Sequence, residues 1–325
     1  MSEQQSVSST PTNTRRHVLV TGASTGIGAD AAQALAQSGW YVLAGVRKPE
    51  DGQRLVEVFE GAATAGRSGG RSAAGGRIEP LLLDVTNADQ IAAAAQHIDA
   101  TVGPGGLEAL VNNAGIVVSG PLEMIPLDRF RYQLEVNVTG LLAVTRACLP
   151  LLRNASRSAE QREGGTPRIG ARIVNISSVN GALAPPYMGP YAASKHAVEA
   201  ISDSLRIELR RWRIHIALVE PGPVATPIWD KAKKNAETME TDLPPEASDL
   251  YGGDVDAMRE AVHDLADKAI PVERVTRQVV HALEARRPRF RYFPTWEARL
   301  SHKVFRMVPE PWRDAIVRRA LGLKP

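Results

Sequence analysis

The chain has a single cysteine and almost no net charge, and each scarcity argues against a class of protein. One cysteine, Cys148, in 325 residues excludes an intramolecular disulfide framework and indicates a reducing compartment. A formal net charge of +3 gives no reason to expect a nucleic acid partner. Residues 1–16 lack the apolar core of a secretory signal, so they indicate a disordered leader. These features predict a cytoplasmic location.

Long apolar runs are also missing, and we expect that no stretch approaches the length of apolar sequence needed to span a bilayer. A hydrophobic fraction of 43% is nevertheless enough for a large core. Cys148 lies in the apolar helical pattern LLAVTRACLPLL, which favours a buried structural thiol over a nucleophile. No spacing of His, Cys, Asp and Glu residues suggests a metal site.

Short apolar or β-branched runs alternate with longer helical patterns along the chain. This alternation predicts an α/β fold, with a parallel sheet of about seven strands and helices on both faces. The expected strands are 17–22, 40–46, 79–85, 109–115, 172–178, 214–222 and 289–295. The expected helices are 29–39, 87–102, 127–153, 191–212 and 272–285.

The organisation predicted from these patterns is a single domain over 17–295, followed by a basic helical extension over 296–325. Two inserts, 61–76 and 154–171, are rich in Gly, Ser and Arg and have no helical or strand period, so we expect mobile surface loops. The acidic, helical and Met-bearing stretch at about 226–271 interrupts the sheet pattern, as a substrate lid would.

Three glycines, Gly22, Gly26 and Gly28, lie in TGASTGIG between an expected strand and an expected helix. Glycine weakens regular structure, so three at such a junction indicate that a phosphate approaches the backbone. Gly22 would permit the tight turn, Gly26 the approach of a pyrophosphate, and Gly28 the packing of helix on strand. The G-x-x-x-G-x-G spacing differs from the usual dinucleotide fingerprint, and a purely structural turn is the alternative.

The stretch YAASK places Tyr191 and Lys195 on one face of an expected helix. A phenol has an ordinary pKa near 10, and an ammonium one turn away should lower it toward a useful range. Ser178 ends an expected strand thirteen residues before Tyr191, where its hydroxyl can hold a substrate carbonyl while the tyrosine delivers a proton. For Tyr-x-x-x-Lys alone, an unrelated surface pair is the alternative.

Taken together, these motifs resemble those of the short-chain dehydrogenase/reductase family in its one-domain form. TGASTGIG looks like its cofactor loop, NNAG like its motif after the fourth strand, and YAASK like its catalytic signature. EVNVTG and PGPVAT complete the set in the family's order. The resemblance implies a Rossmann-type, doubly wound fold. It also implies hydride transfer between a nicotinamide cofactor and an alcohol or carbonyl carbon.

The resemblance implies roles for the matching positions. Tyr191 would be the general acid/base, Lys195 would lower its pKa and hold the ribose hydroxyls, and Ser178 would orient the substrate oxygen. Asn137 would lie in a local bend of the long helix and hold a water that relays protons from Lys195. The implied cofactor contacts, besides Tyr191 and Lys195, are Gly22, Ser24, Thr25, Gly26, Ile27, Gly28, Asp84, Val85, Asn113, Ala114, Gly115, Pro221, Gly222, Val224 and Thr226.

The end of the second strand favours NADP(H) over NAD(H). Where NAD-preferring members carry a carboxylate for the ribose hydroxyl, this chain has Val46 followed by Arg47, whose guanidinium could bind a 2′-phosphate. Against this, Thr25 stands where many NADP-dependent relatives have a basic residue, and Glu50 or Asp51 could fold back. A solvated loop charge is the alternative for Arg47.

Apolar residues near the catalytic motif and in the expected lid could line a substrate cavity. Tyr187, Met188 and Trp229, with Ile228 and Met239, suit a bulky lipophilic alcohol or ketone. The extended tail is most similar to the hydroxysteroid and retinol dehydrogenase subgroup, which suggests a steroid or retinoid.

The tail is strongly basic, with eleven Lys or Arg against three Asp or Glu between residues 286 and 325. A helix folded onto the subunit or a partner is one interpretation, and peripheral contact with a membrane surface is the other. The family resemblance also implies a homodimer or homotetramer. A non-catalytic cofactor sensor and a membrane-recruited interaction protein are the alternative functions, and the intact set of catalytic residues argues against the sensor.

Overall fold

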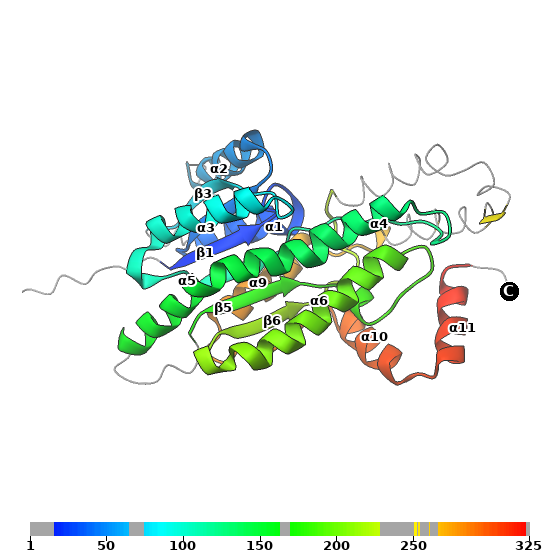
Figure 1. The fold of residues 1–325 in the computed structure, drawn as a ribbon. Helices are drawn as coiled ribbons and strands as arrows, with labels where there is room; N and C mark the ends of the chain where they lie inside the picture. Colours follow the sequence, from blue (N-terminus) through cyan, green and yellow to red (C-terminus); the bar gives the residue numbers. More distant parts are fainter. Residues whose placement is uncertain are drawn as a thin grey trace, which may run out of the picture.

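Seven parallel strands form one sheet in the order β3-β2-β1-β4-β5-β6-β7, with helices on both sides (Figure 1). The computed structural model describes residues 16–64, 75–162, 170–227, 250–251, 253, 260 and 266–322. The expected seven-stranded parallel α/β sheet is therefore confirmed. The strands are β1 (His17–Thr21), β2 (Tyr41–Val46), β3 (Arg77–Leu82), β4 (Ala109–Asn112), β5 (Arg172–Ile176), β6 (His215–Val219) and β7 (Arg291–Tyr292).

Two apolar cores lie on opposite faces of the sheet, because alternate residues of each buried strand point to opposite sides. The larger helices are α1 (Gly26–Gln37), α2 (Pro49–Thr64), α3 (Ala88–Val102), α4 (Leu127–Leu134), α5 (Leu141–Arg162), α6 (Gly189–Glu208), α9 (Val272–Glu284), α10 (Trp296–Met307) and α11 (Glu310–Ala320). Val18 and Val20 of β1 join the core under α1, α2 and α9, whereas Leu19 joins the core under α3, α5 and α6.

The strand order creates the place where a site can form. β1 pairs with β2 on one side and with β4 on the other, so successive crossovers run in opposite directions from β1. At such a switch point the loops after the two central strands separate and leave a crevice at the carboxyl edge of the sheet. The glycine-rich loop follows β1 and the NNAG segment includes the end of β4, so both border this crevice.

Helix α2 and the end of α5 differ from the sequence-based expectation. No helix was expected at Pro49–Thr64, and the insert 154–171 was expected to be a loop, but α5 continues to Arg162. The continuation is stabilised by small residues: Ala155 and Ser156 are buried, and the Ser156 hydroxyl accepts a hydrogen bond from the Ala171 N–H at 2.9 Å. The remaining parts of both inserts, 65–74 and 163–169, lie outside the described residues.

The long helical run Leu127–Gln161 is apolar and long enough to cross a membrane, so the expectation that no segment meets those criteria was wrong. Length and composition alone are weak evidence, because a core helix of a folded domain meets the same criteria. Here Val144, Cys148 and Leu152 of α5 are buried against the sheet. The run therefore has the packing of a core helix.

The carboxyl-terminal part of the chain adds β7 and two helices at one end of the molecule (Figure 1). The expected strand 289–295 is reduced to two paired residues at the edge of the sheet, and α10 packs on η3 (Val179–Gly181). Most of the expected lid, and residues 1–15 of the expected leader, lie outside the described residues. Of the lid region, Ile270 forms a parallel bridge with Val224.

Candidate active site

The loop between β1 and α1 forms a tight cradle that only glycine can make. Gly22 and Gly26 have φ angles of +63° and +58°, in the left-handed region that side chains disfavour. A Cβ atom on Gly28 would lie 2.2 Å from the carbonyl oxygen of Gly22. The three positions singled out in the sequence are thus fixed by backbone geometry.

The start of α1 offers backbone N–H groups to an anion. Thr25 precedes the helix with an extended backbone, and its side chain makes no capping hydrogen bond. The first N–H groups of a helix lack partners within the helix and carry partial positive charge. The cradle and this uncapped helix end fit the pyrophosphate of a nicotinamide dinucleotide.

Asn113 holds the shape of this cradle. Its side-chain amide donates to the carbonyl oxygens of Thr21 and Gly22, both at 3.0 Å. In return, the Thr21 hydroxyl accepts from the N–H groups of Asn113 and Ala114 at 3.0 and 3.1 Å. The cofactor contact that the resemblance implies for Asn113 stays a prediction. Gly115 lies next to Asn137, whose Oδ1 would be 3.3 Å from an added Cβ.

The residues expected near the adenine and its ribose lie after β2 and β3. Asp84 accepts hydrogen bonds from the N–H and hydroxyl of Thr86 at 2.9 and 2.7 Å, which fixes the turn after β3, and Val85 is buried. Arg47 is exposed directly after β2 and forms no ion pair with the residues that the structure describes. Asp51 lies 3.5 Å from Arg54, so this carboxylate already has a cation beside it.

Ser178, Tyr191 and Lys195 come together at the carboxyl edge of the sheet. Ser178 follows β5 and caps η3 by accepting from the Asn180 N–H at 3.2 Å. A side-chain hydrogen bond joins Ser178 to Tyr191. The Lys195 ammonium donates to the carbonyl oxygen of Ile176 at 2.8 Å and lies 5.6 Å from the centre of the Tyr191 ring.

Burial governs the proton affinities of Tyr191 and Lys195. It raises the pKa of Tyr191 above its ordinary value, and the hydrogen bond from Ser178 offsets only part of this. This is contrary to the lowering expected from Lys195. Burial also lowers the pKa of Lys195 to about 8, although the negative charge of Glu199 favours the ammonium. Tyr191 is therefore protonated at neutral pH.

Asn137 lies in a π-helical turn, η2 (Glu135–Gly140), between α4 and α5. This turn is the local irregularity expected in the long helix. The Asn137 side chain accepts from the Ile116 N–H at 2.9 Å and donates to the Ile116 carbonyl and the Ser194 hydroxyl at 3.0 and 3.1 Å. It thus connects the segment after β4 to α6, one residue before Lys195. The expected water relay stays a prediction.

The segment after β6 approaches the glycine loop closely. It includes Pro221 and Gly222, Val224 is buried, and Thr226 would lie 3.2 Å from a Cβ on Gly26. This approach brings the residues expected at the nicotinamide beside the cradle expected at the pyrophosphate.

Of the expected substrate residues, Tyr187 and Met188 precede α6. Tyr187 has a φ of +63°, and its carbonyl oxygen accepts from the Gly120 N–H at 2.7 Å. Its ring packs edge-on against Tyr251, with centroids 6.5 Å apart. Met188 is partly buried before the first turn of α6. Trp229, Ile228 and Met239 lie outside the described residues.

A buried ionic cluster next to the catalytic residues was missed by sequence reasoning. Glu199, one turn after Lys195, accepts from the Ser177 hydroxyl at 2.6 Å and pairs with Arg291 of β7. Arg291 also lies 2.8 Å from Glu220, whose other carboxylate oxygen is 2.7 Å from His302 of α10. The Lys-x-x-x-Glu spacing was a visible signal for Glu199, whereas nothing local pointed to Arg291.

The family model described as short chain dehydrogenase matches residues 16–237. The chain belongs to this family. An NADPH-dependent 3-dehydrocapnine reductase of Ornithobacterium rhinotracheale is 32% identical over 301 residues, which cover 93% of this chain and 95% of that protein. Retinol dehydrogenase 5 of Homo sapiens is 32% identical, covering 92% and 87%. The 17-beta-hydroxysteroid dehydrogenase type 6 of Bos taurus is also 32% identical, covering 94% and 88%.

Solved structures of this family share the fold. A short chain dehydrogenase from Burkholderia cenocepacia J2315 in complex with NADP has a TM-score of 0.63 and 26% identity, covering 96% of this chain and 98% of that one. A relative from Burkholderia phymatum in complex with NAD has a TM-score of 0.69 and 24% identity, covering 90% and 95%. The protein is thus an NAD(P)-dependent dehydrogenase or reductase.

Proposed function

We propose that the chain is an NADP(H)-preferring enzyme that interconverts a lipophilic carbonyl compound and its alcohol, with Tyr191 as the general acid/base. The main support for the proposal is that Ser178, Tyr191 and Lys195 lie together beside the glycine cradle.

The chain's own residues have the chemistry for the proton half of the reaction. When bound, the nicotinamide cofactor supplies or accepts the hydride. In reduction, the Ser178 hydroxyl donates a hydrogen bond to the substrate oxygen, and Tyr191 gives its phenolic proton to that oxygen as negative charge develops on it. The Lys195 ammonium then stabilises the phenolate. In oxidation the same proton returns to Tyr191. The raised pKa of Tyr191 keeps it protonated at neutral pH, which favours carbonyl reduction.

The proposal is tested by removing only the phenolic hydroxyl group of Tyr191. We expect Tyr191→Phe to lower kcat/KM by about 10²- to 10⁴-fold, the usual contribution of general acid–base catalysis. Tyr132→Phe, on the exposed surface of α4, is the matched control and should leave turnover unchanged. The assay follows NADPH and NADH consumption with steroid ketones, retinal and medium-chain carbonyls beside small polar ones. Turnover that survives in Tyr191→Phe would show that another group is the acid. Cofactor binding without any turnover would instead favour the sensor function.

The preference for NADP(H) is supported by Arg47 and by relatives that use this cofactor. The 3-dehydrocapnine reductase is NADPH-dependent, and the Burkholderia cenocepacia protein binds NADP, although the Burkholderia phymatum protein binds NAD. Because a charge-assisted hydrogen bond contributes about 1.5–3 kcal/mol, Arg47→Ala should raise KM for NADPH roughly tenfold or more. KM for NADH should change little, and Arg54→Ala is the control. An equal rise for both cofactors would contradict a role in binding the 2′-phosphate.

The proposal of a bulky apolar substrate is supported by the names of two relatives, a retinol dehydrogenase and a hydroxysteroid dehydrogenase, and by Tyr187 and Met188 before α6. The assay panel separates this class from small polar carbonyls. Preference for the small compounds would contradict it.

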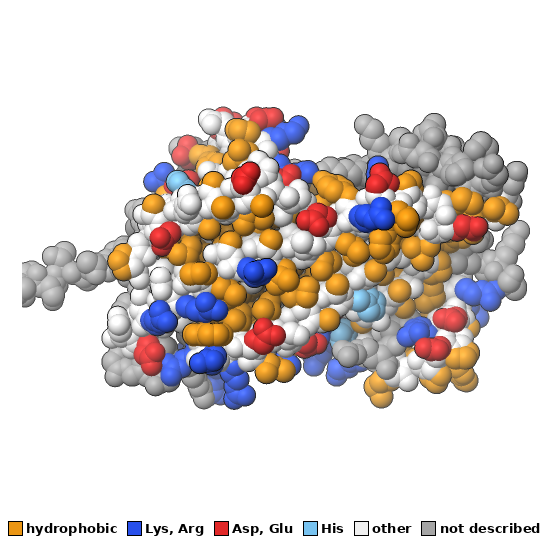
Figure 2. Space-filling view, in the orientation of Figure 1, with side chains coloured by type: hydrophobic (Ala, Val, Ile, Leu, Met, Phe, Trp, Pro, Cys, Tyr) orange, Lys and Arg blue, Asp and Glu red, His pale blue; other side chains and the backbone are white. Residues whose placement is uncertain are grey.

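A homo-oligomer through the long helices is also part of the proposal. Figure 2 shows hydrophobic side chains gathered along the face formed by α5 and α6, and Ile207 at the end of α6 is 68% exposed. Sedimentation velocity should give a dimer or tetramer that Ile207→Glu weakens. A monomer at micromolar concentration would overturn this part.

A further inference from the structure

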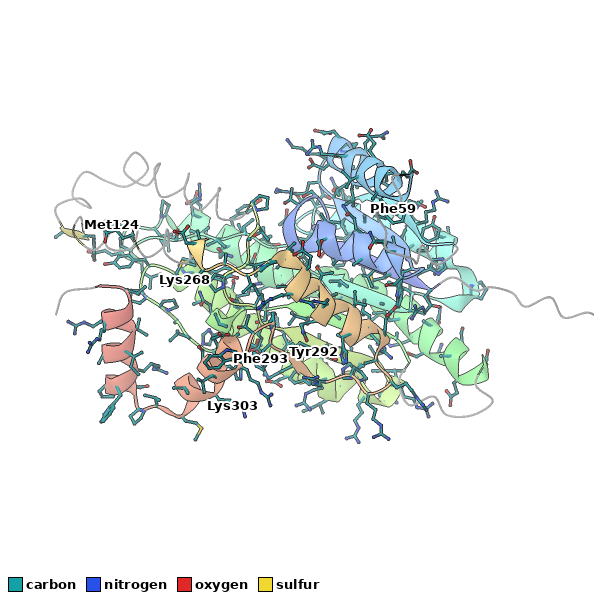
Figure 3. All side chains as sticks on the ribbon, turned by 180° about the vertical axis from the view of Figure 1, so that it is seen from behind. Phe59, Met124, Lys268, Tyr292, Phe293 and Lys303 are labelled. Carbon is teal, nitrogen blue, oxygen red and sulfur yellow. The ribbon has the colours of Figure 1, made fainter. Side chains whose placement is uncertain are left out.

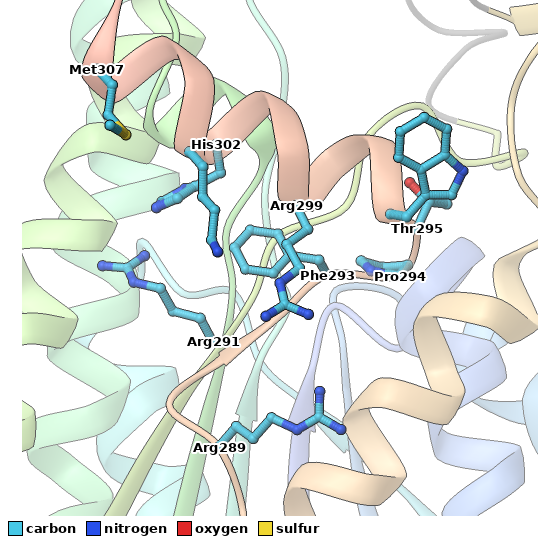
Figure 4. Close-up of a pocket in the computed structure, with 10 residues that line it drawn as sticks. Arg289, Arg291, Phe293, Pro294, Thr295, Arg299, His302 and Met307 are labelled. Carbon is cyan, nitrogen blue, oxygen red and sulfur yellow. The ribbon is translucent and has the colours of Figure 1, made fainter.

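A pocket lies away from the catalytic residues, between the edge strand β7 and helix α10 (Figure 4). Its volume is about 810 Å³, within the range of small-molecule sites. Its lining comes from residues 289–307 and contains none of Ser178, Tyr191 and Lys195. It is therefore distinct from the carbonyl site.

The pocket concentrates positive charge. Four basic side chains line it: Arg289, Arg291, Arg299 and Lys303. The acids Glu199, Glu220 and Asp203 pair with Arg291, but Arg289, Arg299 and Lys303 form no ion pair with the residues that the structure describes. Figure 4 shows Arg299 reaching from α10 toward the segment of β7, and Arg289 lies on the chain just before β7; both line the pocket.

Like charges that share a concave surface repel one another, and an anion in the hollow would relieve that repulsion. A second copy of the chain is a poor occupant, because a symmetric contact here would bring two sets of these cations together. The charge therefore points to an anionic ligand.

The same pocket is also apolar. Phe293, Pro294, Trp296 and Met307 line it beside the basic groups, and Figure 3 shows Phe293 and Lys303 on this side of the molecule. Trp296 and Met307 are 69% and 84% exposed, and Leu300 on the same helix is also exposed. Large exposed apolar side chains beside a charged hollow suit a ligand with a hydrocarbon part. A bare inorganic anion would leave this surface uncovered.

We propose that the pocket between β7 and α10 binds an anionic amphiphile, with its phosphate-like head group on Arg299 and Lys303 and its hydrocarbon part against Trp296 and Met307. The head group is recognised in the same way whether the amphiphile comes singly from solution or from a membrane.

The first test is calorimetric titration of the full chain with dioctanoyl phosphatidic acid below its critical micelle concentration. Inorganic phosphate and zwitterionic dioctanoyl phosphatidylcholine are the comparison ligands. We expect phosphatidic acid to bind about tenfold or more tightly than either, with affinity that falls as salt rises. Equal affinity for inorganic phosphate would overturn the proposed role of the apolar residues Trp296 and Met307. Equal affinity for phosphatidylcholine would overturn the proposed role of the cations Arg299 and Lys303.

The second test changes the pocket. Arg299→Glu/Lys303→Glu should weaken phosphatidic acid binding by about tenfold or more, and the milder Arg299→Ala/Lys303→Ala should weaken it less. Arg274→Glu/Arg277→Glu, two exposed cations on α9, is the matched control and should bind like the parent. Unchanged NADPH binding in each variant shows that it is folded. Unchanged phosphatidic acid binding in both pocket variants would overturn the proposal.

The third test separates the sources of the ligand with vesicles of phosphatidylcholine, with and without phosphatidic acid. Sedimentation with the acidic vesicles alone, lost in Arg299→Glu/Lys303→Glu, would place the ligand in a membrane. Binding of the soluble amphiphile without sedimentation would make it a free ligand. Sedimentation that persists in the pocket variant would assign membrane contact to another surface and overturn the proposal.

Discussion

Lys195 keeps an ammonium group in a buried position, and this single residue couples the stability of the protein to pH. Burial lowers its pKa to about 8 from an ordinary 10.5. Between these two pH values the unfolded chain binds a proton that the folded chain has released. The contribution of Lys195 therefore makes the free energy of unfolding increase as pH rises through this window. The charge that catalysis needs is thus unfavourable for folding at neutral pH.

Lys195→Met should abolish turnover and remove this pH-dependent cost. The gain in unfolding free energy of the variant over the parent should be larger at pH 7 than at pH 10, by roughly 2 kcal/mol. Urea unfolding of both proteins at the two pH values measures it. An identical difference at both pH values would mean that Lys195 has an ordinary pKa in the folded chain.

Alanine substitutions at Gly28 and Gly61 form a matched pair that tests the close packing of the glycine cradle. A Cβ on Gly28 would collide with the backbone of Gly22, whereas a Cβ on Gly61 in α2 meets nothing within 4 Å. Gly28→Ala should therefore destabilise the fold by about 1–3 kcal/mol and weaken cofactor binding. Gly61→Ala should stabilise it by up to about 1 kcal/mol, because alanine favours helix. Thermal unfolding and cofactor titration measure both. Equal effects of the two changes would contradict the close approach at Gly28.

At the scale of elements, α6 is the helix on which catalysis and the buried ionic cluster meet. Tyr191, Lys195 and Glu199 follow one another at four-residue intervals along one face. Glu199 is held by Ser177 and by Arg291 of the edge strand β7, and Arg291 also pairs with Glu220 at the end of β6. The position of Glu199 therefore depends on β7. The electrostatic effect of the Glu199 carboxylate on Lys195 depends on β7 in the same way.

Glu199→Gln keeps the size of the side chain and removes its charge. Because the carboxylate favours the ammonium, its loss should lower the pKa of Lys195 further below about 8. The alkaline limb of the kcat/KM profile for carbonyl reduction should then move to lower pH. Glu208→Gln, exposed at the end of the same helix, should leave the profile unchanged. Profiles that coincide in all three proteins would show that Glu199 does not act on Lys195.

Sequence patterns predicted the elements whose signals are local. The strands were recognised because buried parallel strands are apolar on both faces, and the glycine loop because its turn needs φ angles that other residues avoid. The end of α5 was misjudged for the opposite reason. Ser156 and Gly170 have loop-like composition, but they make a close contact that no local pattern reveals.

At the scale of the whole molecule, the strand order explains why the site was largely predictable and the ionic cluster was not. Parallel strands end at one edge of the sheet, so motifs that follow β1, β4, β5 and β6 must gather there. Arg291 reaches Glu199 across 92 residues of sequence, and only the finished sheet brings them together. The raised pKa of Tyr191 also depends on tertiary burial.

The single thiol offers a measure of how often the whole core opens. Cys148 is 2% exposed between α5 and the sheet, and burial raises its pKa to about 12. A thiol-reactive dye can therefore modify the protein only during excursions that lift α5 from the sheet. Labelling at pH 8 should be orders of magnitude slower than in urea, and bound cofactor should slow it further by the factor 1 + [L]/Kd. Labelling of the native protein at the rate of a free thiol would contradict this. The labelling rate of Cys148 in the native chain therefore reports how often the core opens, and no engineered probe is needed.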